Sequence, residues 1–165
     1  MILRSFVLMF GLAGAFGAAQ FPSYSQQYMQ RLGGAVDALA QVVADFDASA
    51  ASLGLSREAA LGQMTGSAFV EARRIDMQNT FKRYEGLQTD LQALQSYGPF
   101  MRAYNVAHLT DSEITRGTWD AFEPSAPLSF AGLVFAAFGF VVSSGAVVAA
   151  SRLLRQTTRR PAMPA

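Results

Sequence analysis

The amino-acid sequence predicts an all-α membrane protein, in which two transmembrane helices flank a periplasmic antiparallel hairpin of long helices with short extra helices. Two apolar segments carry the membrane prediction, because no charged side chain lies between Arg4 and Arg31 or between Glu123 and Arg152. The chain between these segments repeats its apolar residues at helical spacing, which predicts the hairpin. We therefore expect four parts: a transmembrane helix at 1–21, a helical domain at 22–127, a second transmembrane helix at 128–151 and a basic tail at 152–165.

The N-terminal apolar segment covers residues 5–21, close to the lower limit of about 17 residues for a helix that crosses a bilayer core. Gly11, Gly14 and Ala18 form a stripe of small residues that favours close packing against another helix. The segment also has the features of a signal peptide with a cleavage site after Ala19. We favour a retained transmembrane helix, and detection of a shortened mature protein would contradict that interpretation.

The C-terminal apolar segment is the stronger candidate for a membrane span. Residues 128–150 carry no charge, and they exceed the roughly 20 residues that a helix needs to cross the bilayer core. The middle domain is too small to bury a helix that is apolar on every face. Gly132, Gly139 and Ser143 supply small residues that are expected to pack against the first span.

The arginines beside the two spans predict the topology, because positive charge next to a span stays in the cytoplasm. These arginines are Arg4, Arg152, Arg155, Arg159 and Arg160. Both termini are then cytoplasmic, and the middle domain faces the periplasm or its equivalent. That domain holds all 12 acidic residues and 8 of the 13 basic ones, a net charge of −4, which makes nucleic acid an unsuitable partner.

Two long helices are predicted in the middle domain. Pro22 suits the first turn of the first helix. Apolar residues from Met29 onward recur at alternating spacings of three and four, and Gly54 suits a C-cap. The second helix covers 68–97, and the two apolar stripes should pack on each other or on a partner, since neither is stable alone in water. The residues expected in this interface are Leu32, Val36, Leu39, Val43, Phe46, Met77, Phe81, Tyr84, Leu87, Leu91 and Leu94.

Shorter helices are expected beside the hairpin. Ser56 is the expected cap of a helix at 57–64, and residues 100–109 should form another short helix or a turn. Thr110 and Glu113 form a capping box, which predicts a further helix that ends near residue 122.

Aromatic residues lie near both expected membrane boundaries. They are Phe21, Tyr24 and Tyr28 after the first span, and Trp119, Phe122 and Phe130 before the second. An aromatic belt at the membrane surface explains these positions, and simple core packing explains them as well.

The sequence offers no set of residues for catalysis or for a cofactor. It has no cysteine and one histidine, His108, which precedes a helix start and is expected to be structural. No paired-histidine metal motif or phosphate-binding loop is present, and no ionisable residue lies within either span, where a transport path would need one. We therefore predict no catalytic residue, metal, cofactor or small-molecule ligand.

The charged residues of the middle domain are expected to form ordinary surface ion pairs. A basic patch on the second long helix, Arg73, Arg74, Lys82 and Arg83, is expected to meet acidic residues of the first, Asp37, Asp45 and Asp47.

Several short motifs along the chain are found together in a known family. They are Gln20-Phe21-Pro22, Gln26-Gln27-Tyr28, Arg31-Leu32-Gly33-Gly34, Gly54-Leu55-Ser56-Arg57-Glu58, Tyr97-Gly98-Pro99-Phe100 and Thr118-Trp119, with Phe122, Pro124 and Pro127-Leu128 after them. With these motifs the chain resembles an uncharacterised bacterial membrane family known as domain of unknown function 2937. The resemblance covers nearly the whole chain. It implies a bacterial inner-membrane protein, and it transfers no activity, ligand or catalytic residue.

The function that fits these features best is that of a non-enzymatic interaction or structural protein of the bacterial envelope, anchored in the lipid bilayer. Its hairpin would bind a partner protein or a second copy, because four-helix bundles often assemble from two hairpins. A sensor or adaptor subunit is an alternative, and it would have to signal through a separate partner. An enzyme is a third alternative, which a deep pocket lined by acidic residues would support.

Overall fold

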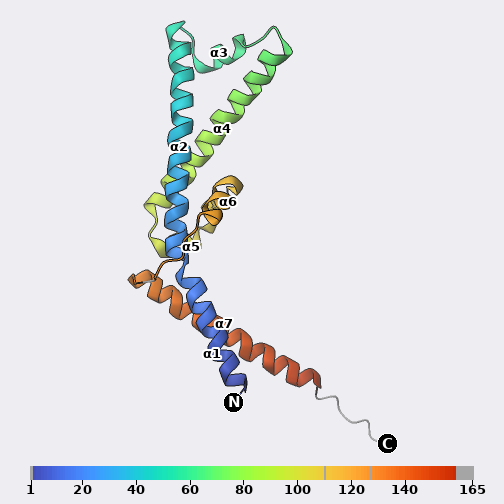
Figure 1. The fold of residues 1–165 in the computed structure, drawn as a ribbon. Helices are drawn as coiled ribbons and strands as arrows, with labels where there is room; N and C mark the ends of the chain where they lie inside the picture. Colours follow the sequence, from blue (N-terminus) through green and yellow to red (C-terminus); the bar gives the residue numbers. More distant parts are fainter. Residues whose placement is uncertain (1, 110, 127, 159–165) are drawn as a thin grey trace, which may run out of the picture. The chain divides into compact units, whose positions relative to one another are not determined.

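The computed structural model describes residues 2–109, 111–126 and 128–158, and these ranges contain helices and no strand. Figure 1 shows the helices in chain order. They are α1 (Ile2–Ala19), α2 (Phe21–Ser52), α3 (Arg57–Gln63), α4 (Ala68–Ser96), α5 (Pro99–Tyr104), the 3-10 helix η1 (Val106–Leu109), α6 (Ser112–Asp120) and α7 (Phe130–Thr158).

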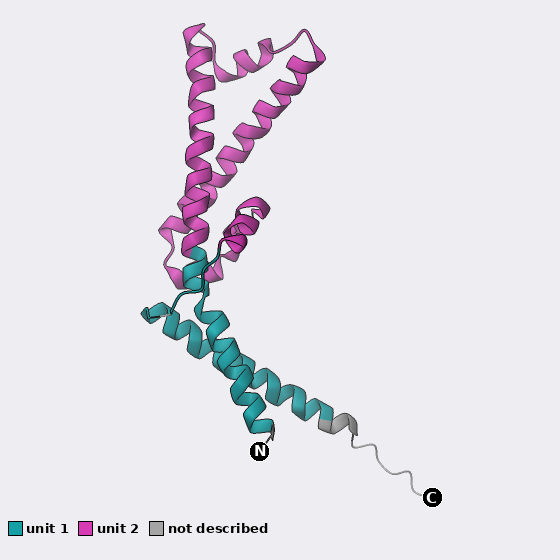
Figure 2. Cartoon of the chain, viewed as in Figure 1, with its two compact units in different colours: residues 1–25, 122–165 teal, residues 26–121 magenta. Residues whose placement is uncertain are grey.

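The chain divides into two compact units (Figure 2). Unit 1 joins Met1–Ser25 to Phe122–Ala165, and unit 2 is Gln26–Ala121. Unit 2 is thus a few residues shorter at each end than the helical domain expected at 22–127. Helix α7 also runs past the expected end of the second span, so the first part of the expected tail is helical.

Helices α1 and α7 pack against each other along unit 1. Gln20, between α1 and α2, links this part of the chain to the segment that precedes α7. Its side-chain amide donates to the Ser125 carbonyl (3.2 Å) and accepts from the Ser125 amide (3.0 Å). The Phe21 and Phe135 rings lie beside this pair, with centroids 5.4 Å apart. Two helical stretches are long and apolar enough to cross a membrane, one near the N-terminus within Leu3–Ser52 and the other at Phe130–Leu154.

Local sequence signals account for the helix ends of unit 2. Gly54 has a φ of +71°, and the bonds from the Gly54 amide to the Ala51 carbonyl and from the Leu55 amide to the Ala50 carbonyl form a Schellman motif after α2. The Ser56 hydroxyl accepts from the Ala59 amide at the start of α3, which confirms the predicted cap.

The cap of α6 differs from the prediction. Thr110, the predicted N-cap, lies outside the described residues, and the N-cap of α6 is Asp111. Its carboxylate accepts from the amides of Glu113 (3.2 Å) and Ile114 (2.9 Å). Aspartate suits this position because it satisfies two free amides and its charge complements the helix dipole.

Helices α2 and α4 run in opposite directions, and α3 connects them at the end where they stand furthest apart (Figure 1). A small core joins the three helices, with Val43 of α2, Leu61 of α3 and Phe81 of α4 buried at its centre. The Phe46 and Phe81 rings meet edge to face, with centroids 5.2 Å apart. The short helix predicted at 57–64 corresponds to α3, whose Leu61 packs between the two long helices in this core.

At the end of unit 2 opposite α3, the other helices pack around the first turns of α2 that belong to this unit. Tyr28 is fully buried, and its hydroxyl accepts from the Asp111 amide (3.3 Å). The Arg102 side chain donates to the Gln26 side chain (3.4 Å) and to the Leu94 carbonyl (3.0 Å). These contacts hold α5 and α6 against α2, and burial lowers the pKa of Arg102.

Candidate functional site

Two features of the structure are candidates for function. The first is the seam between α1 and α7 in unit 1, made by Gly11, Gly14, Ala18, Gly139 and Ser143. The second is the α3 end of unit 2, residues 46–77, which comprises the end of α2, α3 and the start of α4.

The seam is too tight for larger residues. A Cβ atom added to Gly14 would lie 2.6 Å from the Ser143 Cβ atom and 2.8 Å from the Gly139 carbonyl oxygen. A Cβ atom on Gly139 would lie 2.6 Å from the Ala18 Cβ atom, and one on Gly11 would overlap with the α7 side chains opposite it. Because the Ser143 Cβ atom, the Gly139 carbonyl oxygen and the Ala18 Cβ atom are fixed to the backbone, they cannot move aside without moving a helix.

Gly11, Gly14, Ala18, Gly139 and Ser143 therefore lie together in the seam. Gly132 is buried in the first turn of α7, where its amide donates to the Ser129 hydroxyl (3.1 Å). Sequence reasoning missed Ser144, whose hydroxyl donates to the Val7 carbonyl of α1 (3.3 Å). Helical spacing could have found it, because Ser144 lies four residues after Phe140, and both side chains face Gly11 of α1.

The arginines expected to set the topology are only partly described. Arg4 is exposed near the start of α1, and Arg152 is exposed near the end of α7. Arg155 belongs to α7, and its side chain is not described, whereas Arg159 and Arg160 lie outside the described residues.

The eleven residues expected in the hairpin interface all face inward to some extent. Six are buried: Leu32, Val36, Val43, Phe81, Leu87 and Leu94. Five are half-buried: Leu39, Phe46, Met77, Tyr84 and Leu91.

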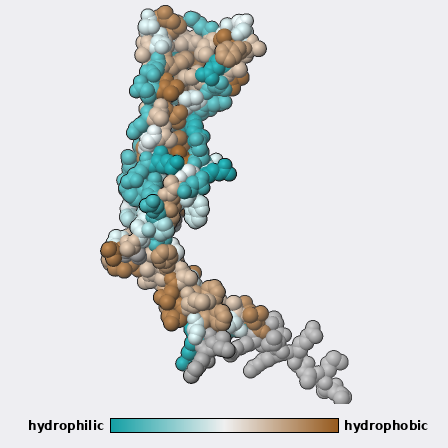
Figure 3. Space-filling model, in the orientation of Figure 1, coloured by the Kyte–Doolittle hydropathy of each residue, from teal (hydrophilic) through white to brown (hydrophobic). Residues whose placement is uncertain are grey.

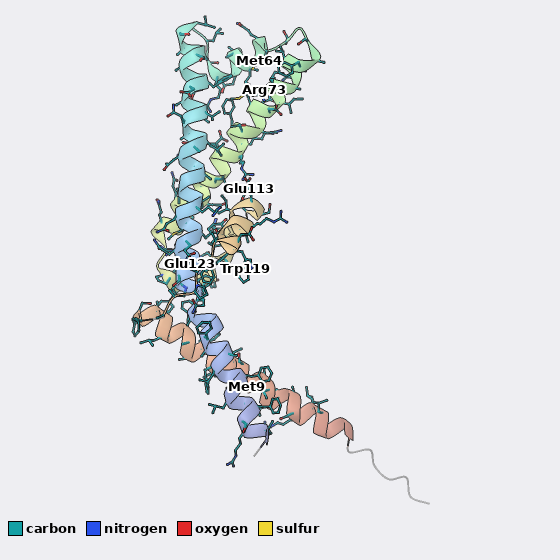
Figure 4. All side chains as sticks on the ribbon, in the orientation of Figure 1. Met9, Met64, Arg73, Glu113, Trp119 and Glu123 are labelled. Carbon is teal, nitrogen blue, oxygen red and sulfur yellow. The ribbon has the colours of Figure 1, made fainter. Side chains whose placement is uncertain are left out.

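The α3 end exposes large apolar side chains. Leu53 and Phe69 are each 74% exposed, and Ile75 is about half exposed. A shallow cavity of about 220 Å³ lies between the end of α2 and α3, with Phe46 and Met64 among its lining residues. Figure 4 labels Met64 and Arg73 at this end of unit 2.

A bidentate ion pair links α2 to α3 at the same end. The Arg57 guanidinium donates to both carboxylate oxygens of Asp47, at 2.8 and 2.5 Å, and lies over the Phe81 ring, 4.6 Å from its centroid. The hydrogen bonds from Arg57 lower the pKa of Asp47, and the same bonds raise the pKa of Arg57. At the start of α3, hydrogen bonds to the Glu58 carboxylate from its own backbone amide and from the Ser56 side chain lower the pKa of Glu58.

The predicted ion pairs between the basic patch of α4 and the acidic residues of α2 are wrong. Arg73 pairs with Asp76 (3.0 Å) and Arg74 with Glu71 (2.6 Å), both within α4. Arg83 pairs with residues at the start of α6, Glu113 (2.6 Å) and Asp111 (3.5 Å). Residues three apart on one helix are already neighbours, so a local pair costs less side-chain entropy than one between separated helices.

His108 has a partner in unit 2. Its Nδ1 atom lies 2.7 Å from Oδ1 of Asp90, which connects η1 to α4, and both side chains are about one-third exposed. Within the described ranges, no group of three or more histidine, cysteine, aspartate or glutamate side chains is placed to hold a metal ion.

The aromatic residues near the expected membrane boundaries separate into two kinds. Tyr28 is a core residue, and Tyr24 packs on Phe122 with the ring centroids 5.8 Å apart. Trp119 and Phe130 are largely exposed. Core packing therefore explains Tyr28 and does not explain Trp119.

Comparison with known proteins found one family whose model matches nearly the whole chain. No curated protein and no solved structure matches it significantly. A family model described as "Protein of unknown function (DUF2937)" matches residues 2–160. The chain therefore belongs to the DUF2937 family.

Proposed function

We propose that this protein is a non-enzymatic interaction protein of a bacterial inner membrane, anchored by α1 and α7 and associating with a second copy through the α3 end. The exposed apolar surface of the α3 end carries this proposal. Exposed surfaces with large apolar side chains are typical of protein contact sites.

The anchor is supported by what α1 and α7 expose. Large apolar side chains are exposed along both helices, and the face of unit 1 seen in Figure 3 is mostly hydrophobic. The exposed side chains include Phe6, Phe10 and Phe16 on α1, and Leu133, Phe138 and Val141 on α7. Surfaces of this kind are stable in lipid, and small residues in the seam are the usual way for two helices to pack there.

The arginines support the orientation. Arg4 lies near the start of α1 and Arg152 near the end of the apolar stretch of α7, so both termini are cytoplasmic. An even number of spans then places unit 2 in the periplasm, in agreement with its net negative charge.

Charges of both signs at the α3 end favour association of two copies. Arg73 and Arg74 lie close to Glu71 and Asp76 on α4, beside the exposed Phe69 and Ile75. In a two-fold contact the same surface meets itself, so a patch of one sign would repel its copy, whereas a mixed patch does not. The apolar side chains then supply the association energy, and the ion pairs surround them.

Photo-crosslinking in native membranes tests the proposal. A photoreactive amino acid replaces Phe69, and a matched variant carries it at Asp37, which is exposed on α2 outside the α3 end. We expect a covalent dimer of twice the chain mass from position 69 and none from position 37. Co-expressed tagged and untagged chains should also co-purify in mild detergent.

Three results would contradict the proposal. Adducts of equal yield from both positions would show non-specific contact, and monomeric behaviour in both experiments would exclude self-association. A discrete adduct of position 69 with another protein would show that the α3 end binds a different partner.

A further inference from the structure

A second exposed apolar surface lies at the opposite end of unit 2 from α3. The chain enters unit 2 at Gln26 and leaves it at Ala121. We call the surface formed there by α5, η1 and α6 the entry end. Its interpretation rests on the proposed function, because it assumes that α1 and α7 cross a membrane.

Contacts within unit 2 place the entry end around the first turns of α2. Arg102 of α5 bonds to Gln26, and the start of α6 bonds to Tyr28 through the Asp111 amide. Further along α6, a Cβ atom on Gly117 would lie 2.7 Å from the Arg31 guanidinium carbon, so that α6 also packs closely on α2.

The entry end exposes aromatic and apolar side chains from each of its three elements. Tyr104 of α5 is 83% exposed, and Trp119 of α6 is 71% exposed. Phe100, Met101 and Val106 are each about half exposed. A groove of about 640 Å³ runs beside Trp119, lined also by Leu109 and Thr115 (Trp119 is labelled in Figure 4).

The covalent chain limits how far this surface can be from a membrane that contains α1. Helix α2 begins at Phe21, and five helical residues to Gln26 advance by about 8 Å along the axis. The headgroup region of a bilayer is of similar depth, since it adds roughly 5–8 Å on each side of the hydrocarbon core. Residues that pack on Gln26 and Tyr28 are therefore within reach of the headgroups.

We propose that the entry end lies in the interface of the bilayer, with Trp119 and Tyr104 among the lipid headgroups and the upper acyl chains. Tryptophan and tyrosine favour this depth because each has an apolar ring and a polar group that remains hydrated. The structure provides both residues in exposed positions on short helices that α2 holds in place.

The attraction is apolar rather than electrostatic. Charges of both signs are mixed at the entry end: Arg31, Arg102 and Arg116 are basic, and Asp111, Glu113 and Asp120 are acidic. A surface without an excess of positive charge gains little from anionic lipid. We therefore expect the same depth of Trp119 in zwitterionic and in anionic membranes.

Trp119 is the single tryptophan of the chain, so the fluorescence of the intact protein reports on this site. The full-length protein is reconstituted into phospholipid nanodiscs. In one series the lipids are brominated near the headgroup end of the acyl chain, and in another iodide is added to the water. We expect emission from Trp119 to be lower in the brominated lipids than in the same lipids without bromine, and iodide to quench it weakly.

Two variants in a Trp119→Phe background calibrate the measurement. Phe69→Trp places the fluorophore at the α3 end, where iodide should quench it strongly and brominated lipid should not. Phe138→Trp places it on α7, where the native ring is 66% exposed on the apolar surface. Lipids brominated deep in the acyl chain should quench it. Circular dichroism checks that both variants keep the native helix content.

The outcomes separate this inference from the proposed membrane anchor. Quenching of Trp119 by brominated lipid, with F138W also quenched, supports the inference. Strong iodide quenching of Trp119 while F138W remains lipid-quenched would overturn the inference and leave the anchor intact. Protection of Trp119 from both quenchers would mean that a protein surface covers it, which also overturns the inference. Failure of brominated lipid to quench F138W would overturn both proposals.

Discussion

Substitution of Gly139 by alanine is expected to separate α1 from α7. The added Cβ atom would lie 2.6 Å from the Ala18 Cβ atom and 2.9 Å from the Gly14 carbonyl carbon. Ordinary contacts of this kind begin near 3.4 Å, so the helices must move apart locally by about 0.8 Å. A gap of 0.5–1 Å forfeits roughly a quarter to a half of the dispersion energy of the atoms that lose contact.

The expected loss of helix-pair stability is about 1–3 kcal/mol, the usual cost of overpacking a tight site. Alanine also has a higher helix propensity than glycine by up to about 1 kcal/mol, which opposes the loss. Gly17 and Gly145 provide matched controls on the same two helices, because an added Cβ atom meets nothing within 4 Å at either position. The difference between G139A and these controls isolates the effect of packing.

The distance between α1 and α7 can be measured directly. The chain contains no cysteine, so a pair of introduced cysteines on the exposed surfaces, at Leu12 and Val142, carries two nitroxide labels without side reactions. Double electron–electron resonance spectroscopy should give a longer or broader distribution of the distance between the two labels for G139A. The detergent concentration at which the two helices separate should also be lower for G139A. Identical behaviour of G139A and G17A would refute the argument from the seam.

Three further predictions concern unit 2. Because Arg57 lowers the pKa of Asp47, this pair stabilises the folded state above the unfolded pKa of Asp47 and ceases to do so as the pH falls through its folded value. The urea midpoint of the wild type should therefore fall more on acidification below about pH 4 than that of D47N. G54A should lower the free energy of unfolding by about 1 kcal/mol, since alanine is strained at a φ of +71°, and thermal unfolding measures it. Y28F leaves the Asp111 amide without its acceptor at 3.3 Å, so we expect a loss of about 1–2 kcal/mol and faster hydrogen exchange at that amide.

Features set by neighbours in the sequence could be predicted well. Ser56 caps α3 and Gly54 ends α2 in the expected manner, because each depends on backbone groups two to five residues away. The small residues of α1 and α7 also recur at helical spacing, so a shared face could be recognised without knowledge of the partner helix.

Choices between competing partners could not be predicted. Carboxylates of α2 and of α6 were both candidate ion-pair partners for Arg83, and it pairs with Glu113 of α6. A long arginine side chain reaches several acceptors at similar free energy, so the fold around it decides. The cap of α6 is a similar case, because Thr110 and Asp111 are adjacent and both residue types suit an N-cap.

The position of α3 changes what the apolar stripe of α2 implies. The heptad spacing continues through Phe46 and Ala50 to Leu53, as if one partner helix covered the whole stripe. Phe46 and Ala50 are covered by the chain itself, whereas Leu53 remains 74% exposed beyond them. Leu53 keeps the spacing of the buried face, but it lies where the helices of the same chain no longer cover that face. An additional helix bound at this point would extend the same packing. Phe69 lies in the first turn of α4, in the same α3 end, so two chains that meet there would cover the part of the stripe that one chain leaves open.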